Sequence, residues 1–236
     1  MANKISDNIE EYLEVLYGNG SNGEQVSTTK LSSELGFAPG SVTQMLKKLE
    51  TLGYIEYTPY KGAILTAEGL EIAQKITRKH RLLEIFLLDI LKIKMENVHE
   101  QACEMEHALS DEAERALCMM LKNPDLCPDK NVIPSCNFDF DNCNQCYSQK
   151  DFDMASTRDF SVLALSELNL DTEGVISFIR GNDELLGIID NLNIKIGGNL
   201  VFKVDDNNDE NLFLVTIDDV EFKIPLKLAN NIFIRI

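Results

Sequence analysis

Apolar side chains recur at helical spacing through the first half of the chain and at strand-like spacing near its end. In the first third, this pattern and its turn residues predict three helices and a hairpin. The predicted elements are a helix from Ser6 or Asp7 to about Tyr17, a loop over residues 18–23, a helix from Ser27 or Thr28 through Leu35, a helix from Pro39 or Gly40 to about Leu52, and strands over residues 54–57 and 63–65. Two short helices around a turn, followed by a hairpin, are typical of a winged helix-turn-helix.

The third of these helices has two distinct faces. Its inward positions are Val42, Met45, Leu46 and Leu49, and its outward positions are Ser41, Thr43, Gln44, Lys47 and Lys48. Short hydroxyls and Gln can reach base edges in a major groove, and lysines contact phosphates. An ordinary surface helix shows the same division, but the flanking helix and hairpin favour DNA binding. The predicted DNA contacts are Ser27, Thr29, Ala38, Pro39, Ser41, Thr43, Gln44, Lys47 and Lys48, with Tyr57, Tyr60 and Lys61 in the wing.

A long helical pattern begins at Thr66, and further helices are predicted over residues 95–107 and 110–121. Within the long helical pattern that begins at Thr66, residues 85–88 form a continuous apolar run, which is more than one core needs. This surplus predicts a dimer interface.

The same helices carry all three histidines of the chain. His80 and Glu84 are four residues apart and share one helix face. A second face, with the i, i+4, i+7, i+8 spacing, carries His99, Cys103, Glu106 and His107. Imidazole, thiolate and carboxylate are the ligands that bind divalent transition metals. The alternative is a solvated polar face, which explains His80 with Glu84 as well as a metal does but explains the second face less well.

Residues 123–151 interrupt the helices with three prolines and four of the six cysteines. Cys143 and Cys146 form a C-x-x-C pair, and Cys127 and Cys136 could complete a four-thiolate site that holds zinc or an iron–sulfur cluster. The spacings match no standard zinc finger, so free thiols or a redox pair stay open as alternatives.

The end of the chain reads as β structure. A short helical stretch is predicted over residues 163–168 and one or two helical turns over 181–193. The predicted strands are residues 174–179, 199–204, 212–217, 220–224 and 232–236. Five short strands with Gly and Asp turns predict a small β-barrel.

Composition narrows the setting. A chain of 236 residues is long enough for one large or two modest domains, and its hydrophobic fraction of 44% allows a proper core. The net charge is −17. Such a charge argues against indiscriminate attraction to nucleic acid, but residues 1–75, with 6 Lys and 10 Asp or Glu, carry only −4 of it. With no membrane-spanning run and no signal-peptide core, we expect a cytoplasmic protein whose cysteines are thiols or metal ligands.

Further motifs point to one family. They are Tyr12-Leu13, Ser41-Val42-Thr43-Gln44, Leu65-Thr66, the segment Lys79–Glu84, Val98-His99 and the segment Cys103–Asp111. Together they resemble the diphtheria toxin repressor family of iron- and manganese-dependent transcriptional regulators, over essentially the whole chain. The C-terminal part resembles the FeoA-like, SH3-like barrel of iron-responsive members.

The resemblance implies two metal sites. One would use His80, Glu84 and His99, and Asp183 or Glu184 would replace the usual ligands from the barrel, unless the site lacks one. The second, activating site would use Cys103, Glu106 and His107 with a ligand from the first helix, where this chain has Glu11 and then Glu14.

The ligand set implied for the second site is a hybrid. Iron-type members have Met at the position of Glu11, whereas manganese-type members have carboxylates at the positions of Glu11 and Cys103. Thiolate with imidazole favours Fe(II) over Mn(II), and the added carboxylate favours harder ions. Fe(II) is therefore the expected cofactor, with Mn(II) as the alternative and zinc considered for the cysteine-rich insert.

These inferences predict a mainly α chain with a small β-barrel. The predicted parts are a winged helix-turn-helix over residues 1–70, a helical metal-binding and dimerisation domain over 71–122, a cysteine-rich insert over 123–157 and an SH3-like domain over 158–236. The expected function is a homodimeric, Fe(II)-activated repressor of metal-homeostasis genes that binds operator DNA and is not an enzyme. A manganese-responsive regulator is the alternative. A metallohydrolase would need an open coordination position, a general base and a substrate pocket, and no nucleophile motif or phosphate loop is visible. The helix-turn-helix argues against a metal-transport accessory module.

Overall fold

The computed structural model describes residues 5–20, 25–149, 157–158, 160, 162–169, 172–203 and 212–236. These residues belong to two compact units, which divide between Thr77 and Arg78. Among the described residues, no helix is both long and apolar enough to cross a membrane.

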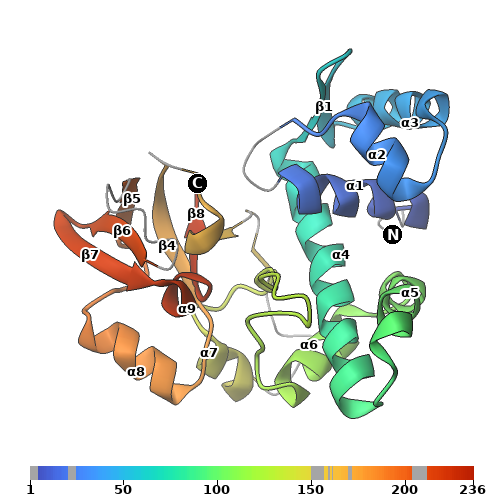
Figure 1. Ribbon diagram of the computed structural model, residues 1–236. Helices are drawn as coiled ribbons and strands as arrows, with labels where there is room; N and C mark the ends of the chain where they lie inside the picture. The colour runs from blue at the N-terminus through green and yellow to red at the C-terminus, as the bar shows by residue number, and fades with distance from the viewer. Residues whose placement is uncertain are drawn as a thin grey trace. The chain divides into compact units, whose positions relative to one another are not determined.

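The first unit contains the predicted helices and hairpin (Figure 1). Its elements are α1 (Asp7–Gly20), α2 (Thr28–Leu35), α3 (Pro39–Thr51), β1 (Ile55–Thr58) and β2 (Gly62–Leu65). The winged helix-turn-helix order is therefore confirmed, and α1 extends three residues beyond the predicted end at Tyr17. Ser27 caps α2 by accepting a hydrogen bond from the backbone N–H of Lys30, and Gly36 ends the helix in the left-handed conformation.

The apolar stripes of these helices form the core of the first unit. The fully buried residues include Leu13 and Leu16 of α1, Leu31 of α2, and Val42, Leu46 and Leu49 of α3. Met45, which was also predicted to point inward, is half-buried. Packing of these stripes leaves the opposite, polar face of α3 exposed.

Gly62 allows the chain before α2 to join the hairpin. Val26 pairs with Ala63 through two backbone hydrogen bonds, of 2.8 and 3.0 Å. A Cβ atom at Gly62 would lie 2.2 Å from the carbonyl oxygen of Val26, and the φ angle of Gly62 is +126°. Only glycine fits both conditions without strain.

Helix α4 (Ala67–Ile85) begins in the first unit and enters the second. The predicted long helix is divided, because α4 passes into a π-helical turn, η1 (Phe86–Ile90). The helices α5 (Met95–Glu106) and α6 (Asp111–Met120) follow, close to their predicted bounds. Ser110 caps α6 by accepting from the N–H of Ala113, 3.2 Å away.

The apolar run at residues 85–88 is not surplus surface in this structure. Ile85 and Leu87 are buried within the chain's own core, together with Leu82, Leu83, Val98, Ala102, Leu117, Cys127 and Ile133. The exposed apolar side chains lie a turn later, where Ile90 and Leu91 are each 51% exposed. The expected dimer surface is therefore better matched by the end of η1 than by the run itself.

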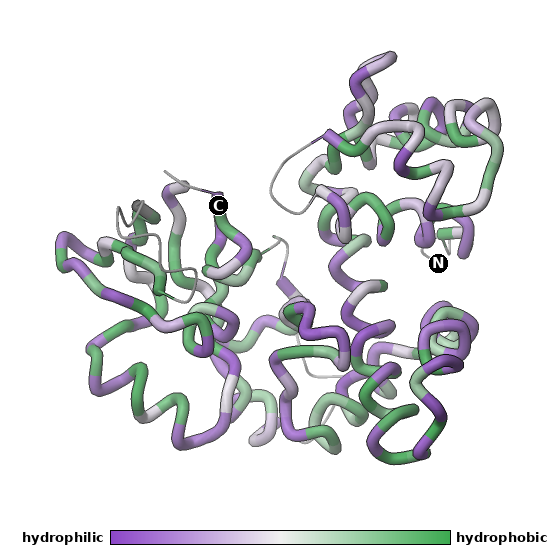
Figure 2. Tube along the Cα trace, in the orientation of Figure 1, coloured by the Kyte–Doolittle hydropathy of each residue, from purple (hydrophilic) through white to green (hydrophobic). Residues whose placement is uncertain are grey.

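The C-terminal part is an antiparallel sheet with strand order β3-β8-β4-β5-β6-β7. The strands are β3 (Leu163–Ala164), β4 (Glu173–Ile179), β5 (Asn199–Lys203), β6 (Leu212–Ile217), β7 (Val220–Pro225) and β8 (Ile232–Arg235). All five predicted strands are present, and hydrophobic positions follow them in Figure 2. The predicted stretch over 163–168 is a strand followed by a 3₁₀ turn, η3 (Leu165–Glu167), and two short helices, α8 (Asp183–Asn191) and α9 (Leu226–Ala229), complete this part.

The prediction of a closed barrel is wrong for the described residues. The sheet stays open, with β3 and β7 as its two edges. Closure would require these edges to pair, but β3 has only two residues and already pairs with β8. A strand of that length has too few backbone groups to form a second ladder.

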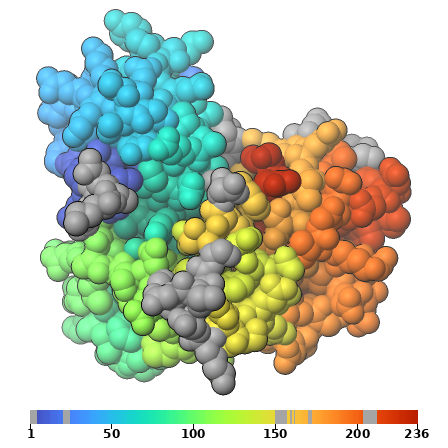
Figure 3. Space-filling model, turned by 180° about the vertical axis from the view of Figure 1, so that it is seen from behind, coloured from blue at the N-terminus to red at the C-terminus, as the bar shows by residue number. Residues whose placement is uncertain are grey.

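The cysteine-rich stretch packs against this sheet. It contains a short helix, α7 (Cys143–Ser148), that the sequence did not predict. The fully buried Arg180, at the end of β4, donates to the carbonyl oxygens of Ile133 and Asn230, at 2.6 and 2.7 Å. Figure 3 shows the yellow-green residues of this stretch against the orange residues of the C-terminal part. The stretch is therefore held by buried polar contacts as well as by apolar ones.

Candidate metal centre

His80 is the central residue of a polar cluster formed by α4 and α5. Its side chain is 6% exposed, and each ring nitrogen faces a carboxylate. Nδ1 lies 2.5 Å from Oε2 of Glu106, and Nε2 lies 3.2 Å from Oε1 of Glu84. Glu84 is one helical turn after His80, whereas Glu106 is brought there by the packing of α5 on α4.

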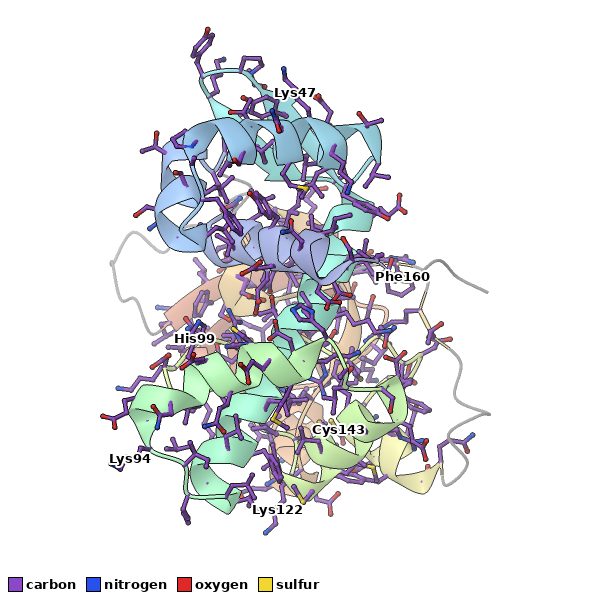
Figure 4. All side chains as sticks on the ribbon, turned by 90° about the vertical axis from the view of Figure 1, so that its right-hand side faces the viewer. Lys47, Lys94, His99, Lys122, Cys143 and Phe160 are labelled. Atoms are coloured by element: carbon purple, nitrogen blue, oxygen red, sulfur yellow. The ribbon has the colours of Figure 1, made fainter. Side chains whose placement is uncertain are left out.

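His99 and Cys103 extend this cluster along one face of α5. Nδ1 of His99 lies 3.1 Å from Nε2 of His80. Sγ of Cys103 lies 3.8 Å from Nδ1 of His80 and 3.9 Å from Nε2 of His99. One donor atom from each of the three residues lies within 4.8 Å of the others. Figure 4 marks His99 on this helix. Two imidazoles and a thiol at this separation suit a divalent transition metal.

Glu106 connects the two predicted sets of ligands. Its carboxylate lies between His80 and His107, whose Nε2 is 3.5 Å from Oε1 of Glu106. The Glu106 residue is 1% exposed, so its carboxylate depends on these partners. The residues predicted as two separate sets are thus continuous through Glu106 and His80. The burial of His80, Glu84 and Glu106 is inconsistent with a solvated polar face at these three positions, whereas the side chain of His99 is 77% exposed.

The protonation of the cluster reflects this crowding. Burial raises the pKa of the Glu84 carboxyl, but hydrogen bonds to His80 and His99 outweigh burial and lower the pKa to about 2. Hydrogen bonds to Cys103 and Glu84 raise the pKa of His99 to about 10. Burial also raises the pKa of the Cys103 thiol, and hydrogen bonds to His80 and His99 again outweigh it and lower the pKa. Glu84 and Cys103 therefore favour the protonated form of His99, and a divalent cation would displace that proton.

The structure places Cys127 near this cluster and away from the other cysteines of the insert. Cys127 is 5% exposed in the core between the helices, where its thiol helps to lower the pKa of Glu84. Cys118 of α6, which was not predicted to be a ligand, instead lines one cavity with Cys136, Cys143 and Cys146. The spacing in sequence gave no signal for Cys118, because it lies on an ordinary amphipathic helix before the insert.

The suggested ligands from the C-terminal part have other surroundings. Asp183 accepts a hydrogen bond from the side-chain amide of Asn144, 2.9 Å away. Glu184 lies in the first turn of α8 beside a different cavity. Among the described residues, neither one joins a group of metal-donor atoms with His80 and His99.

The remaining predicted ligands belong to the first unit. Glu11 is exposed and Glu14 half-buried on α1. Their participation in a metal site stays a prediction.

The predicted DNA contacts lie mostly on the exposed part of the first unit. Thr29, Ala38, Pro39, Ser41, Gln44, Lys47 and Lys48 are exposed. Figure 4 shows Lys47 on the outer side of α3. Thr43 is half-buried, and its hydroxyl donates to the carbonyl of Pro39 at 2.8 Å. Because Ser27 is occupied as a helix cap, these two hydroxyls are less available than those of Thr29 and Ser41.

Two family models match this chain. Residues 4–63 match the iron dependent repressor, N-terminal DNA binding domain, and residues 66–135 match the iron dependent repressor, metal binding and dimerisation domain. The two matches together span more than half of the chain. The chain belongs to the iron-dependent repressor family of metal-dependent transcriptional regulators.

Several curated proteins are similar to this chain. An uncharacterized HTH-type transcriptional regulator of Methanocaldococcus jannaschii is 45% identical over 109 residues, which cover 46% of this chain and 87% of the relative. The iron-dependent repressor IdeR of Mycobacterium tuberculosis is 32% identical over 132 residues, which cover 56% of this chain and 57% of IdeR. The diphtheria toxin repressor of Corynebacterium diphtheriae is also 32% identical, over 55% of this chain and 58% of the relative. The chain thus spans little more than half the length of the last two.

Solved structures share the fold along almost the whole chain. The manganese regulator SloR aligns with a TM-score of 0.50 at 22% identity and covers 98% of this chain and 99% of SloR. The metal-dependent transcriptional regulator MtsR aligns with a TM-score of 0.51 at 23% identity, with the same coverage. At this identity the likeness describes the fold alone.

Proposed function

We propose that this chain is an Fe(II)-activated repressor that binds operator DNA as a homodimer. One observation carries the proposal: His80, His99 and Cys103 bring three metal-donor atoms within 4.8 Å of one another, in a chain whose first unit is a winged helix-turn-helix. The buried carboxylates of Glu84 and Glu106 adjoin these donors. Membership of the iron-dependent repressor family supports both parts of the proposal.

The donors fit a divalent metal ion by their chemistry and charge. Bound metal would supply positive charge in place of the proton held on His99. His80, Glu84 and His99 would hold one ion, and Cys103, Glu106 and His107 would hold the other. Glu11 would complete the second set from α1, with Glu14 beside it. A ligand shared between α1 and the helices that follow would couple metal binding to the position of the recognition helix.

DNA binding would use the exposed face of α3. Gln44 would read base edges, while Lys47 and Lys48 would contact phosphates. Ser41 is the hydroxyl on this face that remains available for a base or phosphate. For the homodimer, we propose a surface that includes the exposed apolar side chains Ile90 and Leu91.

Fe(II) is proposed over Mn(II) because of Cys103. A thiolate favours the softer ion, and Fe(II) also lies above Mn(II) in the general affinity order. Fe(II) should activate DNA binding at a lower free concentration than Mn(II). Cys103→Glu should narrow this difference in activating concentration, and Glu11→Met should widen it. If the wild-type protein responds equally to both ions and neither substitution changes their ratio, these residues do not select the metal.

The test is DNA binding in the presence of buffered metal. A fragment selected from random-sequence DNA with Fe(II) present would be labelled for anaerobic fluorescence anisotropy. Cys103→Ala should reduce the metal-dependent gain in affinity at least tenfold, because it removes a ligand from the proposed activating site while the other ligands remain. Glu100→Ala is the matched control, since Glu100 is the exposed neighbour on α5.

Two results would contradict the proposal. One is binding of the selected fragment by the wild-type protein with equal affinity in Fe(II) and in chelator. The other is an equal response of Cys103→Ala and Glu100→Ala to metal. Circular dichroism of both variants separates loss of the site from loss of the fold.

A further inference from the structure

Four cysteine side chains meet in the second unit at a place separate from the His80 cluster. They are Cys118 of α6, Cys136 of the cysteine-rich stretch, and Cys143 and Cys146 of α7. All four line one small cavity with Phe138 and Phe178. All four are free thiols in this structure. The sequence places Cys118 eighteen residues before Cys136, so only the packing of α6 beside the insert brings it to the other three.

Four buried arginines surround these sulfurs. Arg78, Arg115, Arg158 and Arg180 are between 2% and 7% exposed. Two of them donate directly to thiols: Nη2 of Arg78 lies 2.9 Å from Sγ of Cys118, and Nε of Arg115 lies 3.3 Å from Sγ of Cys146. Arg158 donates to the carbonyl of Cys136.

The positive charge of the arginines is poorly compensated by acidic residues. Within the described part of the chain, Glu114 is the one carboxylate that forms an ion pair with any of the four, at 2.6 Å from Arg78. Arg158 Nη1 is buried without a hydrogen-bond partner. Burial of guanidinium groups whose hydrogen-bond partners are mostly neutral is costly, so this arrangement calls for an anion among them. Neutral thiols would not supply one.

We propose that Cys118, Cys136, Cys143 and Cys146 bind an iron–sulfur cluster. A cluster held by four thiolates is anionic, because the thiolate charge exceeds that of the iron–sulfur core, and it would compensate the surrounding guanidinium groups. The N–H donors of Arg78 and Arg115 would then bond to cluster ligands, which is an arrangement that tunes the reduction potential of such centres.

The spacing of the sulfurs favours a cluster over a single zinc ion. A tetrahedral zinc site with Zn–S bonds of about 2.3 Å requires neighbouring sulfurs about 3.8 Å apart. No three of these four sulfurs form a group within 4.8 Å of one another, although the donors of His80, His99 and Cys103 do. In an iron–sulfur cluster the four thiolates bind to different irons of a core that is larger than one zinc ion. Their sulfurs can therefore lie farther apart than around zinc.

The site lies where three parts of the second unit meet. Cys118 belongs to α6, while Arg78 belongs to α4 and precedes His80 by two residues. Arg180 directly follows β4 and contacts the cysteine-rich stretch. A cluster here would join the metal-binding helices to the sheet through charge compensation. It would use a different set of residues from the proposed regulatory site, so the two proposals can fail separately.

The first experiment is the iron and acid-labile sulfide content of the full-length protein, purified or reconstituted without oxygen and then treated with EDTA. The expected result is iron and sulfide in equal amounts, with the visible absorption of a cluster and an electron paramagnetic resonance signal after reduction. Absence of iron and sulfide from reconstituted wild-type protein overturns the proposal, whatever the variants do. One tightly held zinc per chain, or a disulfide between Cys143 and Cys146, overturns it as well.

Matched cysteine variants then test which thiols are ligands. Cys118→Ser should lower iron and sulfide at least tenfold, whereas Cys127→Ser should leave both unchanged. Loss of the cluster in Cys127→Ser with retention in Cys118→Ser would overturn the assignment. Circular dichroism checks the fold, and the rate of air oxidation of the cluster in an Arg115→Lys variant, which keeps all four thiols, tests the site without removing a ligand. A rate equal to that of the wild type would contradict the contact between Arg115 and the cluster.

Discussion

Glu114 of α6 and Arg78 of α4 form a buried ion pair that joins the two helices. Arg78 lies two residues before His80. The distance from Arg78 Nε to Glu114 Oε1 is 2.6 Å, and the two side chains are 5% and 2% exposed. Glu114→Gln removes the negative charge and keeps the shape. At an effective dielectric constant of about 20, unit charges about 4 Å apart attract by about 4 kcal/mol.

The measured loss should be somewhat smaller than this attraction. The glutamine oxygen can still accept a hydrogen bond from Arg78, which also donates to the carbonyl of Pro134 at 2.6 Å. Removing one partner of a buried pair commonly costs about 3–5 kcal/mol. We therefore expect Glu114→Gln to lower the free energy of unfolding by about 3 kcal/mol.

Urea unfolding of the metal-depleted protein, followed by circular dichroism at one fixed protein concentration, measures this change. Glu112→Gln is the matched control, because Glu112 is an exposed residue of the same helix and should change stability by no more than about 0.5 kcal/mol. Equal effects of the two substitutions would refute the reasoning, since they would show that Arg78 does not depend on Glu114 for charge compensation.

Three further predictions concern pH, the wing and DNA recognition. The pKa of Glu84 is about 2 in the folded protein instead of 4.5, so its carboxylate stabilises the metal-free fold above pH 4.5. Up to about 3 kcal/mol of the free energy of unfolding is lost as the pH falls towards 2. Glu84→Gln should lack this part of the pH dependence in urea unfolding. Gly62→Ala should lower the melting temperature measured by circular dichroism, because the added Cβ meets a backbone carbonyl at 2.2 Å, whereas Gly40→Ala meets nothing within 4 Å and should not lower it. In anisotropy titrations, Gln44→Ala should relax sequence preference, and Lys47→Ala should weaken binding to all sequences and make the salt slope shallower by about one unit; equal effects of both on specific and random DNA would count against α3 as the recognition helix.

The sequence predicted the helices because their apolar stripes also form the cores in which they are buried. The face of α3 is one example, since the same spacing that buries Leu46 and Leu49 exposes Gln44 and Lys47. The His80 and His99 sets were predicted as separate faces for the same reason. Their connection through Glu106 depends on how α5 packs against α4, and spacing within one helix carries no information about that packing.

Spacing in the sequence also did not show which cysteines lie together in the fold. Proximity in sequence grouped Cys127 with Cys136, but the chain between them turns Cys127 into the helical core beside Glu84. Cys118 reaches the other three thiols only through tertiary packing. The open sheet is a comparable case, because the two-residue strand β3 is too short to leave a pattern in the sequence.

The central claim is that metal and operator DNA bind with coupled free energy, and this coupling must be reciprocal. The most direct measurement is the affinity of the protein for Fe(II), determined anaerobically by competition with a chelator, with and without saturating operator DNA. The account predicts that DNA tightens Fe(II) binding by the same factor by which Fe(II) tightens DNA binding, and that this factor is at least tenfold in the wild-type protein and close to one in Cys103→Ala. An Fe(II) affinity that is unchanged by operator DNA would contradict it.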